Sequence, residues 1–459
     1  MNNPFSCLES KKIAMIGTGV SHNDLIRLFL KKGFDVTVCD RKCAVDLGDI
    51  YEEFSNEGAK FILGDDYLDS LCDFDVVFRT PGMYFNNEKL QNALKNGVVV
   101  TSEMEMFFKV CPCKIYAVTG SDGKTTTTTL ISEFLKEAGK TVHKGGNIGR
   151  ALLPIVEEIS EDDCAVVELS SFQLISMRKS PDVAVITNIT PNHLDVHGTM
   201  DEYIACKKNV FAHQDGFSRT IFNADDEISK GFYDEVRGDL ALFSRYHKVE
   251  NGAFLRDDSY ICYNDRGTVT EIMPSSQIRL PGMHNVENYL TAISAVWGEV
   301  PIAIIRRVAE NFGGVEHRIE FVRETGGVKW YNDSIATSPT RVMAGINAFT
   351  QKLIIIMGGY DKKIPFEPLS EPLNNNAKAL ILMGATAEKI EKVVVEYEGY
   401  SAQKLPIYKA DSMEQAVNIA QDIAQSGDIV TLSPACASFD KYPNFEKRGE
   451  HFKDLVNEL

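Results

Sequence analysis

The sequence predicts an α/β protein of three open α/β domains. Short apolar runs alternate with helical patterns along the chain, and glycine-bearing loops directly follow two of these runs. Alternation of this kind is typical of mostly parallel sheets, whose ligands bind at the carboxyl ends of the strands. The length of 459 residues supports several domains, because a single hydrophobic core stops growing well below that size.

The first predicted domain covers residues 1–103 and begins with a βαβ pattern. An apolar run at 13–16 is followed by Gly17-Thr18-Gly19, then by a helical pattern and a second strand at 34–39. Two further strands are expected, at 76–78 and 98–100. This order predicts a Rossmann-like domain.

Part of a dinucleotide-binding fingerprint lies in this domain. Gly17 and Gly19 precede Asp40, which ends the second strand, but His22 occupies the third glycine position. The pyrophosphate of NAD needs a close helix approach there, so an NAD-dependent oxidoreductase is the weaker interpretation. A nucleotide bound differently at the same strand ends, with Thr80-Pro81-Gly82 across the crevice, is the alternative.

The second predicted domain covers residues 104–315 and is of the mononucleotide-binding P-loop kind. A buried-type strand at 115–118 continues into the loop Gly120-Ser121-Asp122-Gly123-Lys124-Thr125, and a helix follows. Other expected elements are strands at 165–167 and 183–186, turn-rich β segments over 240–280 and a helix over 285–297.

The glycine loop carries the strongest chemical signal. Backbone amides of such a loop point at an anion at the amino end of a helix, Lys124 adds a cation, and Thr125 adds a hydroxyl for magnesium. The spacing Gly-x-x-Gly-Lys-Thr is shorter than the usual form, so we treat it as a variant. Asp122 would repel a triphosphate, so we expect its side chain to point away or toward a cation.

A carboxylate follows the next strand along the chain, and a histidine follows the strand after that. Glu168 lies where a carboxylate could reach a magnesium ion held by Thr125; the alternative is a carboxylate that caps the helix opened by Ser170 and Ser171. His193 lies in a polar loop with Asp195, and the choice between a metal ligand and an exposed histidine stays open.

The third predicted domain covers residues 316–459. Strand candidates at 353–357, 379–383 and 429–432 alternate with helical stretches, which indicates a second Rossmann-like domain.

The composition is that of a folded, acidic protein. Hydrophobic residues make up 44% of the chain, charged residues make up 25%, and the net charge is −17. Nucleic acids and anionic membranes are held mainly by Lys and Arg clusters, so neither is an expected partner. We expect small-molecule substrates and a monomer.

Neither a leader pattern nor a metal-type cysteine arrangement is visible. The first residues lack a charged segment followed by an apolar run, and no window reaches 18 apolar residues, so we expect no membrane insertion and a cytoplasmic location. The ten cysteines include close pairs at Cys39/Cys43 and Cys111/Cys113, without second pairs at zinc spacing. We predict reduced thiols.

The chain resembles the Mur ligases along essentially its whole length, and within them the branch that adds D-glutamate. The resemblance rests on TGSDGKTT, on GGNIG at 145–149, on ELSSFQL and NITPNHLD, on His284-Asn285 and His317-Arg318, and on SPACASFDKYPNFEKRG. The last string is the most diagnostic.

The resemblance implies an ATP-dependent amide ligase of peptidoglycan precursor synthesis with Mg²⁺ as a cofactor. ATP phosphorylates the carboxylate of UDP-N-acetylmuramoyl-L-alanine, the amine of D-glutamate attacks the acyl phosphate, and phosphate leaves. A carboxylate is a poor electrophile, and phosphorylation supplies the leaving group.

The resemblance also implies roles for individual residues. Catalytic roles fall on Lys124, Glu168, His193 and Lys207, and Lys207 matches a carbamylated lysine that would hold magnesium together with Thr125, Glu168 and His193. The alternative is an ordinary surface lysine, with Lys208 beside it. The implied ATP-binding residues are Gly120, Ser121, Asp122, Gly123, Lys124, Thr125, Thr126, Asn285, Asn288, His317, Arg318 and Asp333.

The two other substrates have their own implied residues. Those for the UDP substrate are Val20, Ser21, Asp40, Arg41, Thr80, Gly82, Asn147, Ser170 and Gln173. Those for glutamate are Thr337, Lys362, Ser438, Phe439 and Phe445.

Three positions depart from the family pattern. Ile335 stands where the family often has lysine, Asn192 replaces an acid, and Asp122 replaces an amide. Unless Lys362, Lys363 or Arg341 supplies the missing cation, glutamate recognition would differ, so a related ligase that adds another amino acid or L-glutamate is the alternative. A non-catalytic nucleotide-binding regulator is a further rival, which would leave Glu168, His193 and Lys207 without a role.

Overall fold

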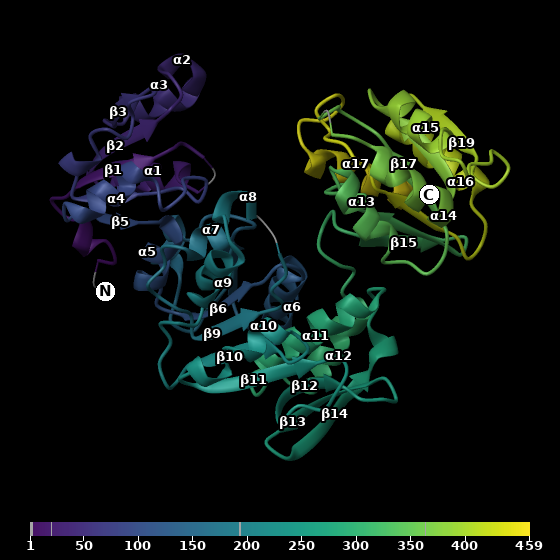
Figure 1. Ribbon diagram of the computed structural model, residues 1–459, viewed down its shortest axis with the longest axis horizontal. Helices are drawn as coiled ribbons and strands as arrows, with labels where there is room; N and C mark the ends of the chain where they lie inside the picture. Colours follow the sequence, from purple (N-terminus) through teal and green to yellow (C-terminus); the bar gives the residue numbers. More distant parts are fainter. Residues whose placement is uncertain (1–2, 20, 192–193, 363) are drawn as a thin grey trace. The chain divides into compact units, whose positions relative to one another are not determined.

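The computed structural model describes residues 3–19, 21–191, 194–362 and 364–459. Within these residues the strands form three sheets, each with helices packed on it, which confirms the α/β fold class (Figure 1). The chain divides by its contacts into two compact units.

The first unit comprises Met1–Gln277 and Val286–Val308, and the second comprises Ile278–Asn285 and Ala309–Leu459. The first unit holds two of the sheets and the second unit holds the third. The boundaries at 103/104 and 315/316 stay predictions.

The amino-terminal sheet is a parallel sheet covered on both faces. Alternate residues of its central strand face opposite ways, so that Ile13 joins the core with Phe29 of one helix while Ala14 joins the core with Leu90 of another. Its strands, in the order β3-β2-β1-β4-β5, are β1 (Lys12–Ile16), β2 (Asp35–Asp40), β3 (Lys60–Leu63), β4 (Val76–Phe78) and β5 (Val99–Thr101), and the two helices are α1 (Asn23–Lys31) and α4 (Glu88–Lys95).

The central sheet surrounds the strand that leads into the glycine loop. Strand β6 (Lys114–Thr119) lies between β8 (Cys164–Glu168) and β9 (Val183–Ile186), parallel to both, so three neighbouring strands end at one edge. The order is β14-β13-β12-β11-β10-β9-β6-β8-β7, with β7 (Val142–Gly146), β10 (Arg219–Asn223), β11 (Asp239–Ser244), β12 (Asn251–Leu255), and the antiparallel β13 (Tyr260–Asp265) and β14 (Thr268–Pro274).

Helix α6 (Lys124–Glu137) follows the glycine loop and is held by the core. Its Phe134 ring contacts the ring of Tyr289 in α11 (Met283–Val296), with centroids 6.0 Å apart. The threonines Thr126 to Thr129 of its first turns are also buried. This packing fixes the amino end of α6 at the carboxyl edge of the sheet.

The third sheet belongs to the second unit and is also covered on both faces. Strand β17 (Leu353–Met357) directs Ile355 to one core and Ile354 to the other. The order is β15-β16-β20-β17-β18-β19, with β15 (Glu320–Thr325) antiparallel and with β16 (Val328–Asn332), β18 (Ala377–Met383), β19 (Ile407–Ala410) and β20 (Ile429–Leu432) parallel. The covering helices are α13 (Pro339–Ile346), α14 (Ser370–Asn376), α15 (Ala387–Val395), α16 (Met413–Ile423) and α17 (Phe445–Glu458).

Two predictions about the whole chain can be compared with the structure. All ten cysteines are free, as predicted, and the thiols of Cys111 and Cys113 lie 3.5 Å apart. In the part of the chain that the structure describes, no helix is both long and apolar enough to cross a membrane.

Candidate active site

The glycine loop is built so that its backbone can approach a ligand closely. Gly120 has φ +144°, and a Cβ there would lie 1.9 Å from Oγ1 of Thr187. Gly123 has φ +78° and caps α6 in the left-handed conformation, which favours glycine. The loop is anchored from the next strand end, because the Thr187 hydroxyl donates to the carbonyl of Asp122 at 2.5 Å.

Two lysines converge on one carbonyl of this loop. Lys124 Nζ donates to the carbonyls of Gly120 (3.0 Å) and Ser121 (2.9 Å), and Lys207 Nζ donates to Gly120 at 2.7 Å. The ammonium of Lys124 therefore lies directly over the loop that was predicted to hold phosphate.

Lys207 lies inside the protein, at the end of α9 (Met200–Lys208), and is 1% exposed. The alternative of an ordinary surface lysine is therefore wrong. Burial, and then the charge of Lys124, lower the pKa of Lys207 from 10.5 to about 7. The neighbouring Lys208 points elsewhere and pairs with Glu235. A large share of Lys207 is thus a neutral amine near pH 7.

A hydroxyl and a carboxylate meet beside the first turn of α6. Thr125 Oγ1 donates to Glu168 Oε2 at 2.7 Å, and Asn147 Nδ2 donates to Glu168 Oε1 at 2.8 Å. The backbone of Asn147 also donates to the Glu168 carbonyl at 2.7 Å. Glu168 therefore ties the Gly145–Gly149 loop to the glycine loop, with two oxygen atoms of the kind that magnesium binds.

Glu168 does not cap the following helix, so that alternative is wrong. The cap of α7 (Ser171–Leu174) is Ser170, whose hydroxyl accepts from the Gln173 amide, while the Gln173 side chain accepts from the Ser170 amide. This capping box fixes both residues, which were predicted to lie near the muramoyl group, directly after Glu168.

The remaining predicted metal ligand cannot be compared with the structure. His193 and Asn192 lie outside the described residues. Among the described residues, no group of three or more His, Cys, Asp or Glu side chains could hold a metal ion. Asp122, whose side chain was predicted to point away from the phosphates or toward a cation, is exposed.

Of the two asparagines predicted for adenine, one lies against the glycine loop. The Oδ1 atom of Asn288 accepts from Thr127 at 3.4 Å, and a Cβ on Gly123 would lie 2.5 Å from it. Asn285 belongs to the second unit and donates from its side chain to the carbonyl of Pro281 at 2.6 Å.

The amino-terminal loop is closed by a carboxylate. Asp40 accepts from the amide and hydroxyl of Thr18 at 2.9 and 3.0 Å, and from the amide of Lys42 at 2.9 Å. His22 is buried under the loop with its pKa lowered to about 4 by burial, and its Nδ1 lies 3.2 Å from the Gly17 carbonyl. The imidazole therefore fills the place where a dinucleotide fingerprint has glycine.

Arg79, which the sequence reasoning did not single out, links this domain to α7. Its guanidinium donates to the Phe172 carbonyl (2.6 Å), the Ser176 hydroxyl (2.8 Å) and the Met83 carbonyl (3.0 Å), and it is 1% exposed. Its place directly before Thr80, at a strand end, was the signal that could have identified it.

Other predicted substrate residues lie nearer the surface: Ser21 and Thr80 are partly exposed, Arg41 and Gly82 are exposed, and Val20 lies outside the described residues.

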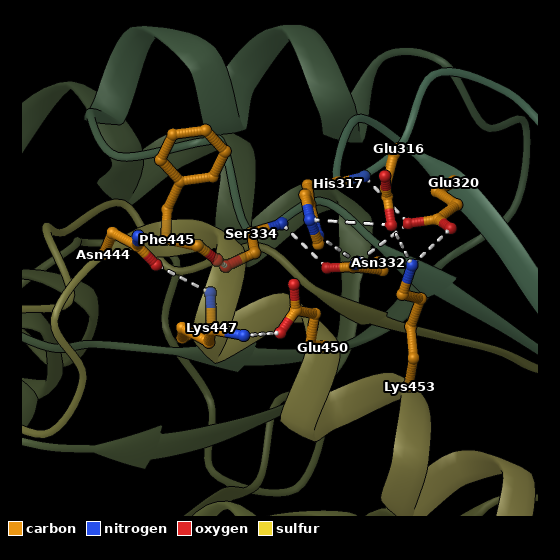
Figure 2. Close-up of polar contacts among 10 residues, drawn as sticks. All are labelled: Glu316, His317, Glu320, Asn332, Ser334, Asn444, Phe445, Lys447, Glu450 and Lys453. Atoms are coloured by element: carbon orange, nitrogen blue, oxygen red, sulfur yellow. Dashed lines mark hydrogen bonds and ion pairs between the residues drawn. The ribbon is translucent and has the colours of Figure 1, made fainter.

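His317 in the second unit is held in one orientation (Figure 2). Its backbone has φ +63°, its amide donates to Glu320 at 2.8 Å, and Asn332 Nδ2 lies 2.9 Å from its Nδ1. A Cβ on Gly449 of α17 would lie 2.2 Å from the same Nδ1. Burial lowers the pKa of the ring, so it is neutral, and donation from Asn332 to Nδ1 leaves the proton on Nε2.

Asp333, predicted for the ribose, is a buried acid with an unusual pKa. Burial raises its pKa to about 7, although Ser433 donates to it at 2.9 Å and the amide of Ile319 donates at 3.3 Å. Arg318 is exposed and lies close enough to favour the ionised form of Asp333.

The residues predicted for glutamate gather near the amino ends of α13 and α17. Lys362 Nζ donates to both the carbonyl and the hydroxyl of Thr337 at 3.1 Å. Ser438 is buried, Phe439 is 65% exposed, and the carbonyl of Phe445 accepts from the Ser334 hydroxyl at 2.8 Å (Figure 2). The diagnostic SPACASFDKYPNFEKRG string, residues 433–449, therefore forms part of this region.

Arg448, in the same string, holds this region together from inside. It is 3% exposed and donates to the carbonyls of Ser334, Ala437 and Cys436 at 2.9 to 3.1 Å, and to the Ser334 hydroxyl at 3.0 Å. Burial lowers its pKa to about 10.

Comparison with known proteins agrees with this arrangement. The model of the Mur ligase middle domain matches residues 118–296, and the model of the Mur ligase glutamate ligase domain matches residues 317–436. A protein of Acetivibrio thermocellus named UDP-N-acetylmuramoylalanine–D-glutamate ligase is 50% identical over 454 residues, which is 98% of this chain and 97% of that protein. The chain belongs to the Mur ligase family.

Other Mur ligases give the same result. The protein of the same name from Clostridium acetobutylicum is 50% identical over 455 residues, covering 98% of this chain and 97% of that protein. A crystal structure of a UDP-N-acetylmuramate–alanine ligase from Thermotoga maritima is 17% identical, covers 98% of this chain and 99% of that chain, and has a TM-score of 0.56. At that identity, the similarity shows the Mur ligase fold alone.

Proposed function

We propose that this chain is an ATP-dependent ligase that adds D-glutamate to UDP-N-acetylmuramoyl-L-alanine during peptidoglycan precursor synthesis. The observation that carries the proposal is the 50% identity, over nearly the full length of both chains, with relatives named for this activity. The alternatives of an NAD-dependent oxidoreductase and of a non-catalytic regulator do not account for that identity.

The first step is phosphorylation of the substrate carboxylate by ATP. The amides of the glycine loop and the Lys124 ammonium would bind the β and γ phosphates at the amino end of α6. Asn285, Asn288 and His317 are assigned to adenine, Asp333 to the ribose and Arg318 to the phosphates, by resemblance. The structure describes these residues in two separate units.

The chemistry of the donor set fits magnesium. Thr125 Oγ1 and Glu168 lie 2.7 Å apart, and a P-loop magnesium needs few protein ligands because phosphate and water oxygens complete its shell. Thr125, Glu168, His193 and Lys207 as a carbamate would hold the metal, which neutralises charge on the phosphoryl oxygens when bound.

Lys207 is suited to carbamylation by its burial. Carbon dioxide reacts with a neutral amine, and a pKa of about 7 makes roughly half of Lys207 neutral at pH 7. An ordinary lysine is neutral there in less than about one molecule in a thousand.

The second step is attack of the glutamate amine on the acyl phosphate, with departure of phosphate. Thr337, Lys362, Ser438, Phe439 and Phe445 are assigned to the amino acid, and the Lys362 cation would pair with one of its carboxylates. The UDP group is assigned to the amino-terminal loop closed by Asp40. The monomeric state and the cytoplasmic location stay predictions.

A substrate panel tests the proposal. Purified protein is given ATP, magnesium, UDP-N-acetylmuramoyl-L-alanine and one amino acid at a time from a set of D- and L-forms, and phosphate release is measured. We expect release with D-glutamate and its loss in the Lys124→Ala variant. Turnover with L-glutamate or another amino acid, and none with D-glutamate, would favour the alternative of a related ligase with a different amino acid substrate, which was suggested by Ile335.

A further inference from the structure

An arginine of the second unit contacts Ile335, one of the three positions at which this chain departs from the family pattern. Arg341 lies in the first turn of α13 and donates from Nη1 to the carbonyl of Ile335 at 3.0 Å. Its side chain is exposed. One of the five N–H donors of the guanidinium is thereby used, and the others remain available on a planar, permanently charged group.

Arg341 lies close enough to Lys362 for its charge to act on that ammonium. Lys362 donates to the carbonyl and the hydroxyl of Thr337, two residues after Ile335, and its pKa is lowered by burial and then by the charges of Arg341 and Arg448. Within the described residues, no carboxylate lies within 4.0 Å of the charged nitrogens of Arg341 or Lys362. The charge of Arg341 acts on the carboxyl of Asp333, which already accepts a hydrogen bond from Ser433.

Like charges held together without acid partners disfavour the folded chain until an anion joins them. The cations of Arg341 and Lys362 lie close to Thr337, and Thr337 and Lys362 are both among the residues assigned to the amino acid substrate. An amino acid with two carboxylates would neutralise two of these cations.

We propose that Arg341 is a specificity-determining residue that binds a carboxylate of the incoming glutamate. It takes the role of the lysine that the family pattern places at Ile335, from a position six residues further along the chain. The inference rests on the proposed function and adds a residue to its amino acid site.

A purely structural role for Arg341 makes a different prediction. If the bond to Ile335 only holds the loop before α13, its loss would disturb the loop as a whole, including the neighbouring residues assigned to ATP. If Arg341 binds glutamate, its loss raises the KM for glutamate and leaves the KM values for ATP and the UDP substrate unchanged.

The test compares steady-state kinetics of Arg341→Gln, Arg341→Lys and the double variant Arg341→Gln/Ile335→Lys. For Arg341→Gln we expect the KM for glutamate to rise roughly 10- to 150-fold, the worth of one charge-assisted hydrogen bond, with the other two KM values within about twofold. The double variant restores the cation at 335 and should recover most of the loss. Lys392→Gln, which removes an exposed cation from α15 with side-chain exposure of 71%, is the matched control.

Each outcome decides the assignment. An unchanged KM for glutamate in Arg341→Gln overturns it, and so does a parallel rise for all three substrates without rescue by Ile335→Lys. A melting curve for each variant separates unfolding from lost binding, and Arg341→Lys keeps the test valid if Arg341→Gln does not fold. The substrate panel with the wild-type protein is run first, so that a failure of the proposed function is seen separately from a failure of the Arg341 assignment. The variants are then assayed with whichever amino acid the wild type uses.

Discussion

Replacing the buried Lys207 with methionine should stabilise the protein while it removes a residue of the proposed site. Lys207 is 1% exposed and has a pKa of about 7 when folded, against 10.5 when unfolded. Between these values the unfolded chain binds more protons, so the contribution of this group to stability rises with pH over that window. Methionine keeps the aliphatic stem and has no such dependence.

The magnitude follows from the two pKa values. Keeping Lys207 in the fold costs about 4 kcal/mol at pH 7 and about 2 kcal/mol at pH 9, and the cost nearly vanishes above pH 10.5. The carbonyl of Gly120 keeps a donor after the substitution, because Lys124 also bonds to it. The stabilisation by Lys207→Met should therefore shrink by about 2 kcal/mol between pH 7 and pH 9.

Urea unfolding at both pH values, in buffers stripped of carbon dioxide so that the amine is free, measures this difference. Lys208→Met is the matched control, since it removes the next lysine of the same helix without touching Gly120. The pH dependence of the first variant should exceed that of the control by about 2 kcal/mol. An equal dependence in both variants would refute the buried, deprotonated state of Lys207.

Three further predictions concern the rest of the site. Glu168→Gln should raise the magnesium concentration needed for half-maximal phosphate release by roughly 10- to 100-fold. An unchanged magnesium titration would show that Glu168 is not a metal ligand. Gly120→Ala places a Cβ 1.9 Å from Thr187 Oγ1 at φ +144°, so it should cost on the order of 2 to 5 kcal/mol in thermal unfolding; a wild-type melting curve would contradict this loop geometry. Arg448→Leu leaves the buried carbonyls of Ser334 and Cys436 without a donor, whereas the Ala437 carbonyl keeps the amide of Tyr360. The substitution should cost on the order of 3 kcal/mol and reduce glutamate use, and equal stability and kinetics would show that the SPACASFDKYPNFEKRG string needs no such support.

The sequence predicted the parts of the fold whose hydrophobic pattern is local. The strand before the glycine loop was recognised because residues 115–118 are apolar and buried on both faces. Strand β7 was missed because its residues, Val142–Gly146, are mostly polar or glycine, and its pairing with β8 comes from the rest of the sheet. Strand β10 (Arg219–Asn223) was also missed, because its apolar run is only two residues long, Ile221 and Phe222.

The candidate site could be predicted from residue types but not from burial. Lys207 was identified by its resemblance to a family position, and only the packing of α9 shows that its amine is inside the protein. Arg79 was overlooked because an arginine after a strand is usually exposed, whereas here the carbonyls of α7, far along the chain, enclose it. Such pairings depend on tertiary structure, which spacing in one sequence does not encode.

Identifying the product formed with D-glutamate shows directly whether this chain adds that amino acid to UDP-N-acetylmuramoyl-L-alanine. Protein, ATP, magnesium and UDP-N-acetylmuramoyl-L-alanine are incubated with isotopically labelled D-glutamate, and the nucleotide product is analysed by mass spectrometry beside the phosphate released. We expect a product heavier by one glutamate residue, formed in equal amount to phosphate, and no product from Lys124→Ala. Phosphate release without labelled product, or a product formed only with another amino acid, would contradict the proposed function.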